Sequence, residues 1–215
     1  MVAPAAEPPM KVISMKTLRD TGQAGTKPGA RVGAVRIIGG QWRGTRLQVP
    51  DVDGLRPSGD RVRETLFNWL MPALPGARVL DVFAGSGALG IEAVSRGAAA
   101  ATLIEQDAAL AGALREVAAR LPGGNALEIV HADALAWLPR ALGEGRRYDI
   151  AFVDPPFAGD LWQQSIAAVL SLLAEDGWLY VEAAADAVIT PPIGWCLHRE
   201  GRTRQVAYRL FRRGA

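Results

Sequence analysis

The stretch VLDVFAGSGALGIEA, Val79–Ala93, joins an apolar run to a helix-like run through a glycine-rich turn. Gly85, Gly87 and Gly90 satisfy the pattern G-x-G-x-x-G. Glycine at such positions lets the backbone turn tightly and approach a ligand closely. The pattern is typical of the first turn in an open α/β sheet that binds an adenosine-containing cofactor. Taken alone, it fits a dinucleotide as well as another such cofactor, or a turn with only a structural role.

Outward from this stretch, strand-like and helix-like runs alternate along the chain. The expected strands cover residues 77–83, 101–106, 127–132, 148–154, 177–183, 194–201 and 204–213. Helical runs separate the first five strands, at residues 88–97, 108–121, 133–142 and 161–173. Repeated strand–helix units predict a Rossmann-like α/β fold, with a mainly parallel seven-stranded sheet covered on both faces. Because only a short turn separates the last two strands, we expect an antiparallel edge there.

The chain before this alternating region has a different character, and we divide it into two parts. Residues 1–34 lack periodicity and are expected to form a flexible tail. Residues 35–76 predict a small extension, a hairpin followed by a helix that Ser58 caps. The apolar face of that helix consists of Val62, Leu66, Trp69 and Leu70. We expect residues 77–215 to form the cofactor-binding catalytic domain.

The composition excludes several classes of protein. Of the 215 residues, 49% are hydrophobic and 21% are charged, which is typical of a soluble globular protein. No apolar run reaches the roughly 18 residues that a membrane span needs, and the first residues do not resemble a secretory signal. The single cysteine, Cys196, excludes an intramolecular disulfide and a multi-cysteine metal site. We therefore expect a cytoplasmic monomer that uses no metal and contacts no membrane.

The charge is distributed unevenly, although the formal net charge is only +2. Residues 1–63 contain 11 Lys and Arg against 5 Asp and Glu, a difference of +6. Residues 64–198 contain 7 against 16, a difference of −9, and residues 199–215 contain 6 against 1, a difference of +5. Basic ends suit a polyanion such as nucleic acid, although ordinary solvated surfaces also carry such runs.

Three acidic residues at expected strand ends indicate what the glycine turn binds. Glu105 lies twenty residues after Gly85, where a carboxylate can accept both ribose hydroxyls, and Asp133 either receives the adenine amino group or caps the following helix. Asp81 would attract the ammonium of a methionine moiety but repel the pyrophosphate of a dinucleotide. We therefore predict S-adenosylmethionine rather than NAD. The predicted cofactor-binding residues are Asp81, Phe83, Ala84, Gly85, Ser86, Gly87, Glu105, Gln106, Asp133 and Ala134.

A second motif, Asp154-Pro155-Pro156-Phe157, ends a strand that we expect to be buried. An exocyclic amino group of a nucleobase is a weak nucleophile because its lone pair is delocalised into the ring. The Asp154 carboxylate and the Pro155 carbonyl can accept the amino hydrogens and so direct the lone pair at a methyl group, while the prolines keep both acceptors rigid. Phe157 offers a face on which an unpaired base can stack. We predict these four residues as the catalytic group.

These motifs resemble the class I, S-adenosylmethionine-dependent amino methyltransferases. The resemblance rests on VLDVFAGSGALGIEA, on LIEQD and on DPPF. The flanking segments are similar to the RsmD family, namely RIIGGQWRGTRL (Arg36–Leu47), LRPSGDRVRETLFNWL (Leu55–Leu70) and QVAYRLFRR (Gln205–Arg213). This resemblance implies methyl transfer to the N2 amino group of guanine-966 in bacterial 16S rRNA, within the 30S subunit or an assembly intermediate of it.

The resemblance also implies that the basic N-terminal segment contacts RNA. The predicted RNA-binding residues are Arg36, Trp42, Arg43, Arg46, Arg56, Arg61 and Arg63. For Trp42, stacking on a base and packing beneath the hairpin are both open. Three rival functions are also open: adenine-N6 methyl transfer in DNA or RNA, NAD-dependent oxidation and reduction, and RNA binding without catalysis.

Overall fold

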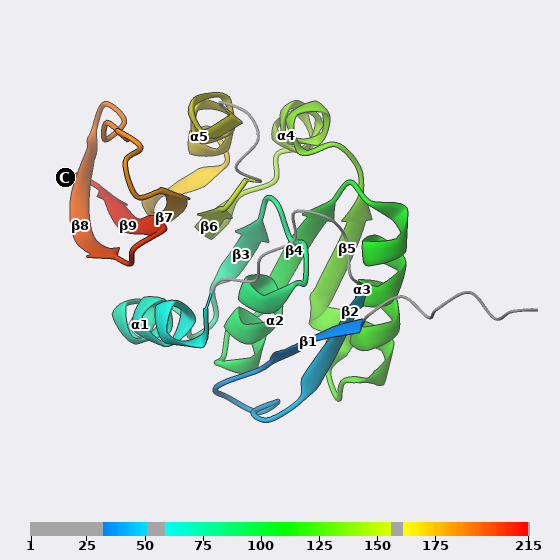
Figure 1. Ribbon diagram of the computed structural model, residues 1–215. Helices are drawn as coiled ribbons and strands as arrows, with labels where there is room; N and C mark the ends of the chain where they lie inside the picture. Colours follow the sequence, from blue (N-terminus) through cyan, green and yellow to red (C-terminus); the bar gives the residue numbers. More distant parts are fainter. Residues whose placement is uncertain (1–31, 51–58, 156–160, 215) are drawn as a thin grey trace, which may run out of the picture.

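The computed structural model describes residues 32–50, 59–155 and 161–214 (Figure 1). The strands are β1 (Val32–Arg36), β2 (Arg46–Pro50), β3 (Arg78–Asp81), β4 (Ala100–Glu105), β5 (Leu127–His131), β6 (Tyr148–Val153), β7 (Leu173–Ala184), β8 (Trp195–Arg202) and β9 (Val206–Arg213). The helices are α1 (Asp60–Leu70), α2 (Ala88–Ser95), α3 (Ala108–Arg120), the 3-10 helix η1 (Gly124–Ala126), α4 (Ala134–Gly143) and α5 (Leu161–Leu170). None of the helices in these described ranges has the length and apolar character of a membrane span.

Seven strands form one sheet in the order β5-β4-β3-β6-β7-β9-β8. The first five run parallel, whereas β9 is antiparallel to both β7 and β8. The chain first adds strands on one side of β3 and then crosses to its other side with β6, so the strand order reverses between these two strands. Ligands of open α/β sheets bind at this reversal, beyond the carboxyl ends of the strands. The predicted Rossmann-like sheet is confirmed, with β9 as its antiparallel strand and β8 at the edge.

Helices cover both faces of the sheet, and an apolar cluster fills the space beneath each layer. The helices α4 and α5 lie on one face of the sheet (Figure 1). Leu138 of α4 and Val169 of α5 pack there in a cluster with Leu80 of β3. On the other face, Leu66 of α1 belongs to a cluster with Val79 of β3, and residues of α2 and α3 complete it. Val79 and Leu80 therefore point to opposite faces, as successive strand residues do. The central strands are apolar on both faces because helices cover both.

The N-terminal extension packs into the same core as the sheet. β1 and β2 form an antiparallel hairpin that begins at Val32, three residues before the predicted start, because Val32 pairs with Pro50. Leu47 of the hairpin is buried in the cluster that contains α2 and α3. The expected apolar face of α1 is confirmed, since Trp69 stacks on Tyr208 of β9 with ring centroids 5.5 Å apart and the other predicted residues are buried. The predicted cap, Ser58, lies outside the described residues.

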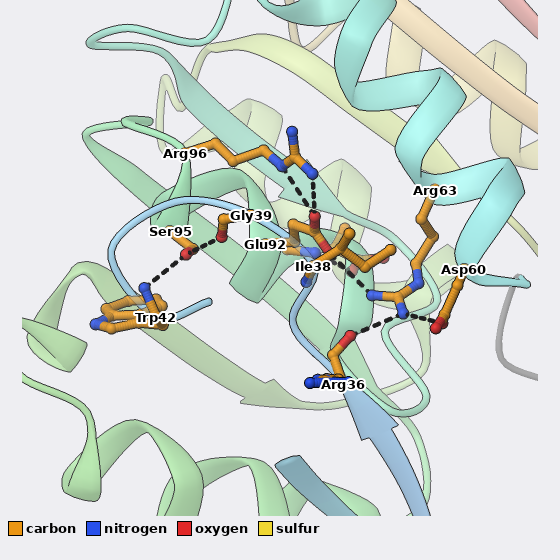
Figure 2. A network of polar contacts seen from close by, with 11 residues as sticks. Arg36, Ile38, Gly39, Trp42, Asp60, Arg63, Glu92, Ser95 and Arg96 are labelled. Atoms are coloured by element: carbon orange, nitrogen blue, oxygen red, sulfur yellow. Dashed lines mark hydrogen bonds and ion pairs between the residues drawn. The ribbon is translucent and has the colours of Figure 1, made fainter. Parts of the chain in front are cut away.

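A buried polar network ties this extension to α2 (Figure 2). Arg63 and Glu92 have no exposed side-chain surface, and Arg63 Nη1 donates to Glu92 Oε2 at 2.9 Å. Arg63 Nη2 also donates to the Arg36 carbonyl at 2.9 Å and to Asp60 Oδ1 at 2.6 Å. Arg96 donates to the second oxygen, Glu92 Oε1, from Nε at 2.8 Å and from Nη2 at 2.6 Å. The guanidinium of Arg63 on α1 thus joins β1, through the Arg36 carbonyl, to α2, through Glu92.

Candidate active site

The glycine turn between β3 and α2 has the backbone conformation that its sequence requires. Gly85 and Gly87 have φ values of 51° and 72°, in the left-handed region that favours glycine. Gly87 is the N-cap residue of α2. A Cβ atom at Gly90 would lie 2.8 Å from Cγ of Leu103, so the absence of a side chain lets α2 pack closely against β4. The three motif glycines therefore shape the turn and fix the helix against the sheet.

Asp81 ends β3 as a buried carboxyl group beneath this turn. Only 2% of its surface is exposed, and its Oδ2 accepts the Gly90 N–H at 2.9 Å. Burial raises the pKa of Asp81 to about 7; the Gly90 hydrogen bond opposes this shift and the Glu105 charge adds to it. A cation at this position would stabilise the ionised form. The carboxyl group therefore fits the ammonium of S-adenosylmethionine and does not fit a pyrophosphate.

Glu105 ends β4 beside the same turn, and both of its carboxylate oxygens accept backbone hydrogens. Oε2 accepts the Gly85 N–H at 2.8 Å, and Oε1 accepts the Asp107 N–H at 2.7 Å. These bonds fix the carboxylate in position, and each oxygen has a second lone pair that can accept a hydrogen bond from a hydroxyl group. Glu105 thus joins the turn after β3 to the end of β4 and is suited to a ribose.

The other predicted cofactor residues follow the carboxyl ends of β3, β4 and β5. Asp133 is the N-cap of α4, where its Oδ1 accepts the Ala136 N–H at 2.8 Å, so the capping role is present. Gln106 is exposed after β4, and its carbonyl oxygen lies 3.1 Å from His131 Nε2. Phe83 is half-buried against the cluster beneath α4 and α5. The remaining members are buried: Ala84, Ser86 and Ala134.

The acceptor motif follows β6, the strand next to β3. The β3 extension remains bonded to β6, since Val82 N–H donates to the Phe152 carbonyl at 3.1 Å. Asp154 is half-buried and Pro155 is buried. Both follow the carboxyl end of β6, and the glycine turn follows the carboxyl end of the neighbouring parallel strand β3. Pro156 and Phe157 lie outside the described residues. The structure thus brings the first two predicted acceptors to the strand reversal where a cofactor would bind.

Sequence reasoning did not single out Tyr180 and Glu182 of β7. The Tyr180 hydroxyl donates to Glu182 Oε2 at 2.8 Å, and both residues are buried. Burial raises the pKa of Tyr180, and the charges of Glu182 and Asp154 raise it further, so both carboxylates act on this hydroxyl. The available signal was an acidic residue, Glu182, inside the otherwise apolar run LYVEA.

Part of the predicted RNA surface is exposed. Arg36 and Arg43 line a pocket of about 430 Å³ together with Ile37, Ile38, Gly44 and Asp60. Both arginines are exposed, as are Arg46 and Arg61. Arg56 lies outside the described residues. The exposed members form a basic region on the hairpin and on α1.

Two predicted RNA contacts lie in the core instead: Arg63, and Trp42, for which packing was the other open alternative. Trp42 is 4% exposed, its indole N–H donates to the Pro122 carbonyl at 3.0 Å, and its backbone N–H donates to Ser95 Oγ at 2.9 Å (Figure 2). Arg63 is 0% exposed and belongs to the Glu92 network. Neither side chain presents a surface to RNA, because tertiary packing has covered both.

The sheet order, the glycine turn and the acceptor motif define a class I, S-adenosylmethionine-dependent methyltransferase. The family model described as conserved hypothetical protein 95 matches residues 35–212. The chain belongs to this family, and the predicted membership of the RsmD family is confirmed.

Named relatives and a solved structure agree with this family. Ribosomal RNA small subunit methyltransferase D of Escherichia coli (strain K12) is 50% identical over 190 residues, which is 85% of this chain and 92% of the relative. The protein of the same name from Haemophilus influenzae is 42% identical over 83% of this chain and 94% of its own length. A solved Escherichia coli structure assigned as a methyltransferase has 49% identity and a TM-score of 0.77, and covers 85% of this chain and 99% of its own.

Proposed function

We propose that this protein methylates the N2 amino group of guanine-966 in 16S rRNA, using S-adenosylmethionine, within the 30S subunit or an assembly intermediate. The observation that carries the proposal is the position of Asp154 and Pro155 beside the glycine turn, at the strand reversal. The names of the close relatives support a ribosomal RNA target. We also propose that the protein acts as a monomer in the cytoplasm.

The acceptors make the amino group of guanine reactive. The Asp154 carboxylate and the Pro155 carbonyl accept its two hydrogens, which draws the nitrogen lone pair out of conjugation and aims it at the cofactor. S-adenosylmethionine supplies an electrophilic methyl group and leaves as S-adenosylhomocysteine. After transfer the nitrogen has one proton too many, and it releases that proton through the acceptors to water. The protein thus contributes position and hydrogen bonds rather than a covalent intermediate.

The cofactor site has a suitable group for each part of S-adenosylmethionine. Asp81 would pair with the methionine ammonium, Glu105 would accept the ribose hydroxyls, and Asp133 would accept the adenine amino group while it caps α4. The glycine turn gives the cofactor access to backbone N–H groups. Phe83 would pack against the adenine.

The basic hairpin would hold the RNA beside this site. Arg36 and Arg43, which line the pocket of about 430 Å³, would bind a backbone phosphate, and Arg46 and Arg61 would add further phosphate contacts. Phosphate contacts of this kind position RNA without reading its sequence. Selection of one guanine would therefore depend on the shape of the ribosomal particle and on contacts in the base pocket.

Substitution of Asp154 tests the proposal, and β6 offers a matched control. Asp149 lies at the opposite end of the same strand, where its Oδ2 accepts the Arg78 N–H at 2.7 Å. Asp154→Ala should lower methyl transfer to 30S subunits by about 100-fold or more, with cofactor affinity and melting temperature close to those of the parent protein. Asp149→Ala should retain transfer. Normal turnover by Asp154→Ala would disprove the proposed mechanism.

A further inference from the structure

The turn between β8 and β9 lies at the same edge of the sheet as the acceptor motif. β7 and β9 are antiparallel and Ala184 pairs with Val206, so β9 begins where β7 ends. The Ala185 N–H donates to the Gln205 carbonyl at 3.0 Å and ties the turn to the chain that leaves β7. Because β7 runs parallel to β6, the turn lies beyond the carboxyl ends of both strands. It is two strand spacings, roughly 10 Å, from the strand that leads into Asp154.

The turn is closed by its own hydrogen bonds and presents two exposed arginines. The Thr203 N–H donates to the Val206 carbonyl at 2.8 Å. Thr203 Oγ1 accepts the N–H groups of Gln205 at 3.2 Å and of Val206 at 3.0 Å. Arg202 and Arg204 flank Thr203, and both are exposed. Because these bonds hold the backbone, the turn needs little further ordering when the two arginines bind a partner.

The charge of this hairpin is almost wholly positive. β8, the turn and β9 contain one acidic residue, Glu200, and six arginines: Arg199, Arg202, Arg204, Arg209, Arg212 and Arg213. Glu200 Oε1 lies 3.0 Å from Arg209 Nε and 3.5 Å from Arg202 Nε, so one carboxylate serves two guanidinium groups. Neither Arg204 nor Asp186, on the loop after β7, forms an ion pair with any residue that the structure describes. The hairpin thus carries five positive charges that its own acidic residue does not compensate.

Protection of the sheet edge does not account for this excess. An edge strand is kept from pairing with other chains by charges of either sign and by bulges, and β8 has an irregular register between Leu197 and Arg199 as well as charged residues. Mixed charges would serve that purpose without the mutual repulsion of five cations. A polyanion bound to the turn would remove this repulsion, and its phosphate groups match the fork of donors on a guanidinium group.

The sheet order places the two arginines on the side of Asp154 away from the cofactor site. The candidate cofactor residues follow β3, β4 and β5 on one side of β6, whereas β7, β9 and β8 lie on its other side. A base that leaves its stack costs unstacking energy, which contacts to the neighbouring backbone can offset. We infer that Arg202 and Arg204 bind backbone phosphates of the RNA beside the target guanine. This inference rests on the proposed function and adds a second phosphate-binding surface to that of the N-terminal hairpin.

Glutamine at both positions tests this surface, because it removes two charges without placing a new charge beside Glu200. The variant Arg202→Gln/Arg204→Gln should bind 30S subunits about tenfold or more weakly. The slope of the logarithm of the binding constant against the logarithm of salt concentration should fall by roughly two. The KM for 30S subunits should rise, while kcat and the affinity for S-adenosylmethionine should stay near those of the parent protein.

The matched control removes two charges at the opposite edge of the sheet. Arg147 precedes β6 and Arg213 ends β9, and both are exposed. Arg147→Gln/Arg213→Gln should retain the binding constant and the salt slope of the parent. Equal weakening in both double variants would reveal an effect of net charge alone and would overturn the inference. Weaker binding of the first variant with an unchanged salt slope would indicate contact with a ribosomal protein and would also overturn it.

The single variant Arg204→Gln keeps the test valid if the double variant does not fold, since this side chain has no ion pair with a described residue to lose. It should lower the salt slope by roughly one, and an unchanged slope would overturn the inference. Self-association of the variants with unchanged binding would show that the arginines only protect the edge, which also overturns it. If the parent forms no N2-methylguanosine but the two double variants still differ in binding, the proposed function fails while this surface is supported.

Discussion

Substitution of Arg63 by methionine tests whether the buried network holds the extension onto α2. Methionine matches the arginine side chain in length up to Nε but offers no donor, so the change removes the guanidinium group while leaving the packing of the aliphatic part. The variant would lose the bonds to Glu92 Oε2, to the Arg36 carbonyl and to Asp60. Glu92 would keep Arg96 as a partner.

The structure sets the expected size of this effect. Removing one partner of a fully buried ion pair costs about 3–5 kcal/mol, because the other charge is left uncompensated. Since Arg96 continues to neutralise Glu92, we expect the lower end, about 3 kcal/mol. At about 2–4 °C per kcal/mol for a chain of this size, the melting temperature should fall by about 6–12 °C.

Urea unfolding followed by tryptophan fluorescence measures the free energy, and thermal unfolding measures the melting temperature. Arg61→Met is the control, since it changes an exposed arginine of the same helix and should stay within about 0.5 kcal/mol of the parent. A loss below about 1 kcal/mol for Arg63→Met would refute the view that this network is a major source of stability.

Two further predictions concern the ligands. Because the pKa of Asp81 is raised to about 7 and the cofactor ammonium pairs with the ionised form, the dissociation constant for S-adenosylmethionine should rise about tenfold per pH unit as the pH falls below 7. Asp81→Asn should bind more weakly and without this pH dependence, and isothermal titration from pH 5.5 to 8.5 checks both; a parallel slope in the variant would exclude Asp81 as the titrating group. Charge reversal at Arg43 and Arg46 should weaken binding to 30S subunits and flatten its dependence on salt, each lost phosphate contact reducing the slope by roughly one. Binding with an unchanged salt slope would show that neither residue contacts a phosphate.

The fold and the positions of several candidate cofactor residues could be predicted from the sequence because they depend on local rules. The alternation of strands and helices predicts the sheet. Gly85 and Gly87 predict a turn that other residues would strain, and Gly90 allows α2 to pack closely against β4. Asp81 and Glu105 follow from their places at strand ends. These features require no knowledge of which distant segments pack together.

Burial of polar residues was the part that the sequence did not reveal. Arg63 is the fourth residue of α1, in a first turn rich in charge, and nothing local distinguishes it from the exposed Arg61. Its burial results from contacts with Arg36 and Glu92, which are distant in the sequence. Trp42 is buried for the same reason, because it contacts Ser95 and Pro122, which are distant in the sequence. The Tyr180–Glu182 pair was not predicted, because its position near Asp154 depends on β7 lying beside β6 in the sheet.

The most direct test of the central claim is methyl transfer from labelled S-adenosylmethionine to 30S subunits that lack the modification, followed by nucleoside analysis and mapping of the product. The proposed function predicts N2-methylguanosine at one position of 16S rRNA, guanine-966. N6-methyladenosine, another methylated nucleoside, or no transfer to the particles would contradict it.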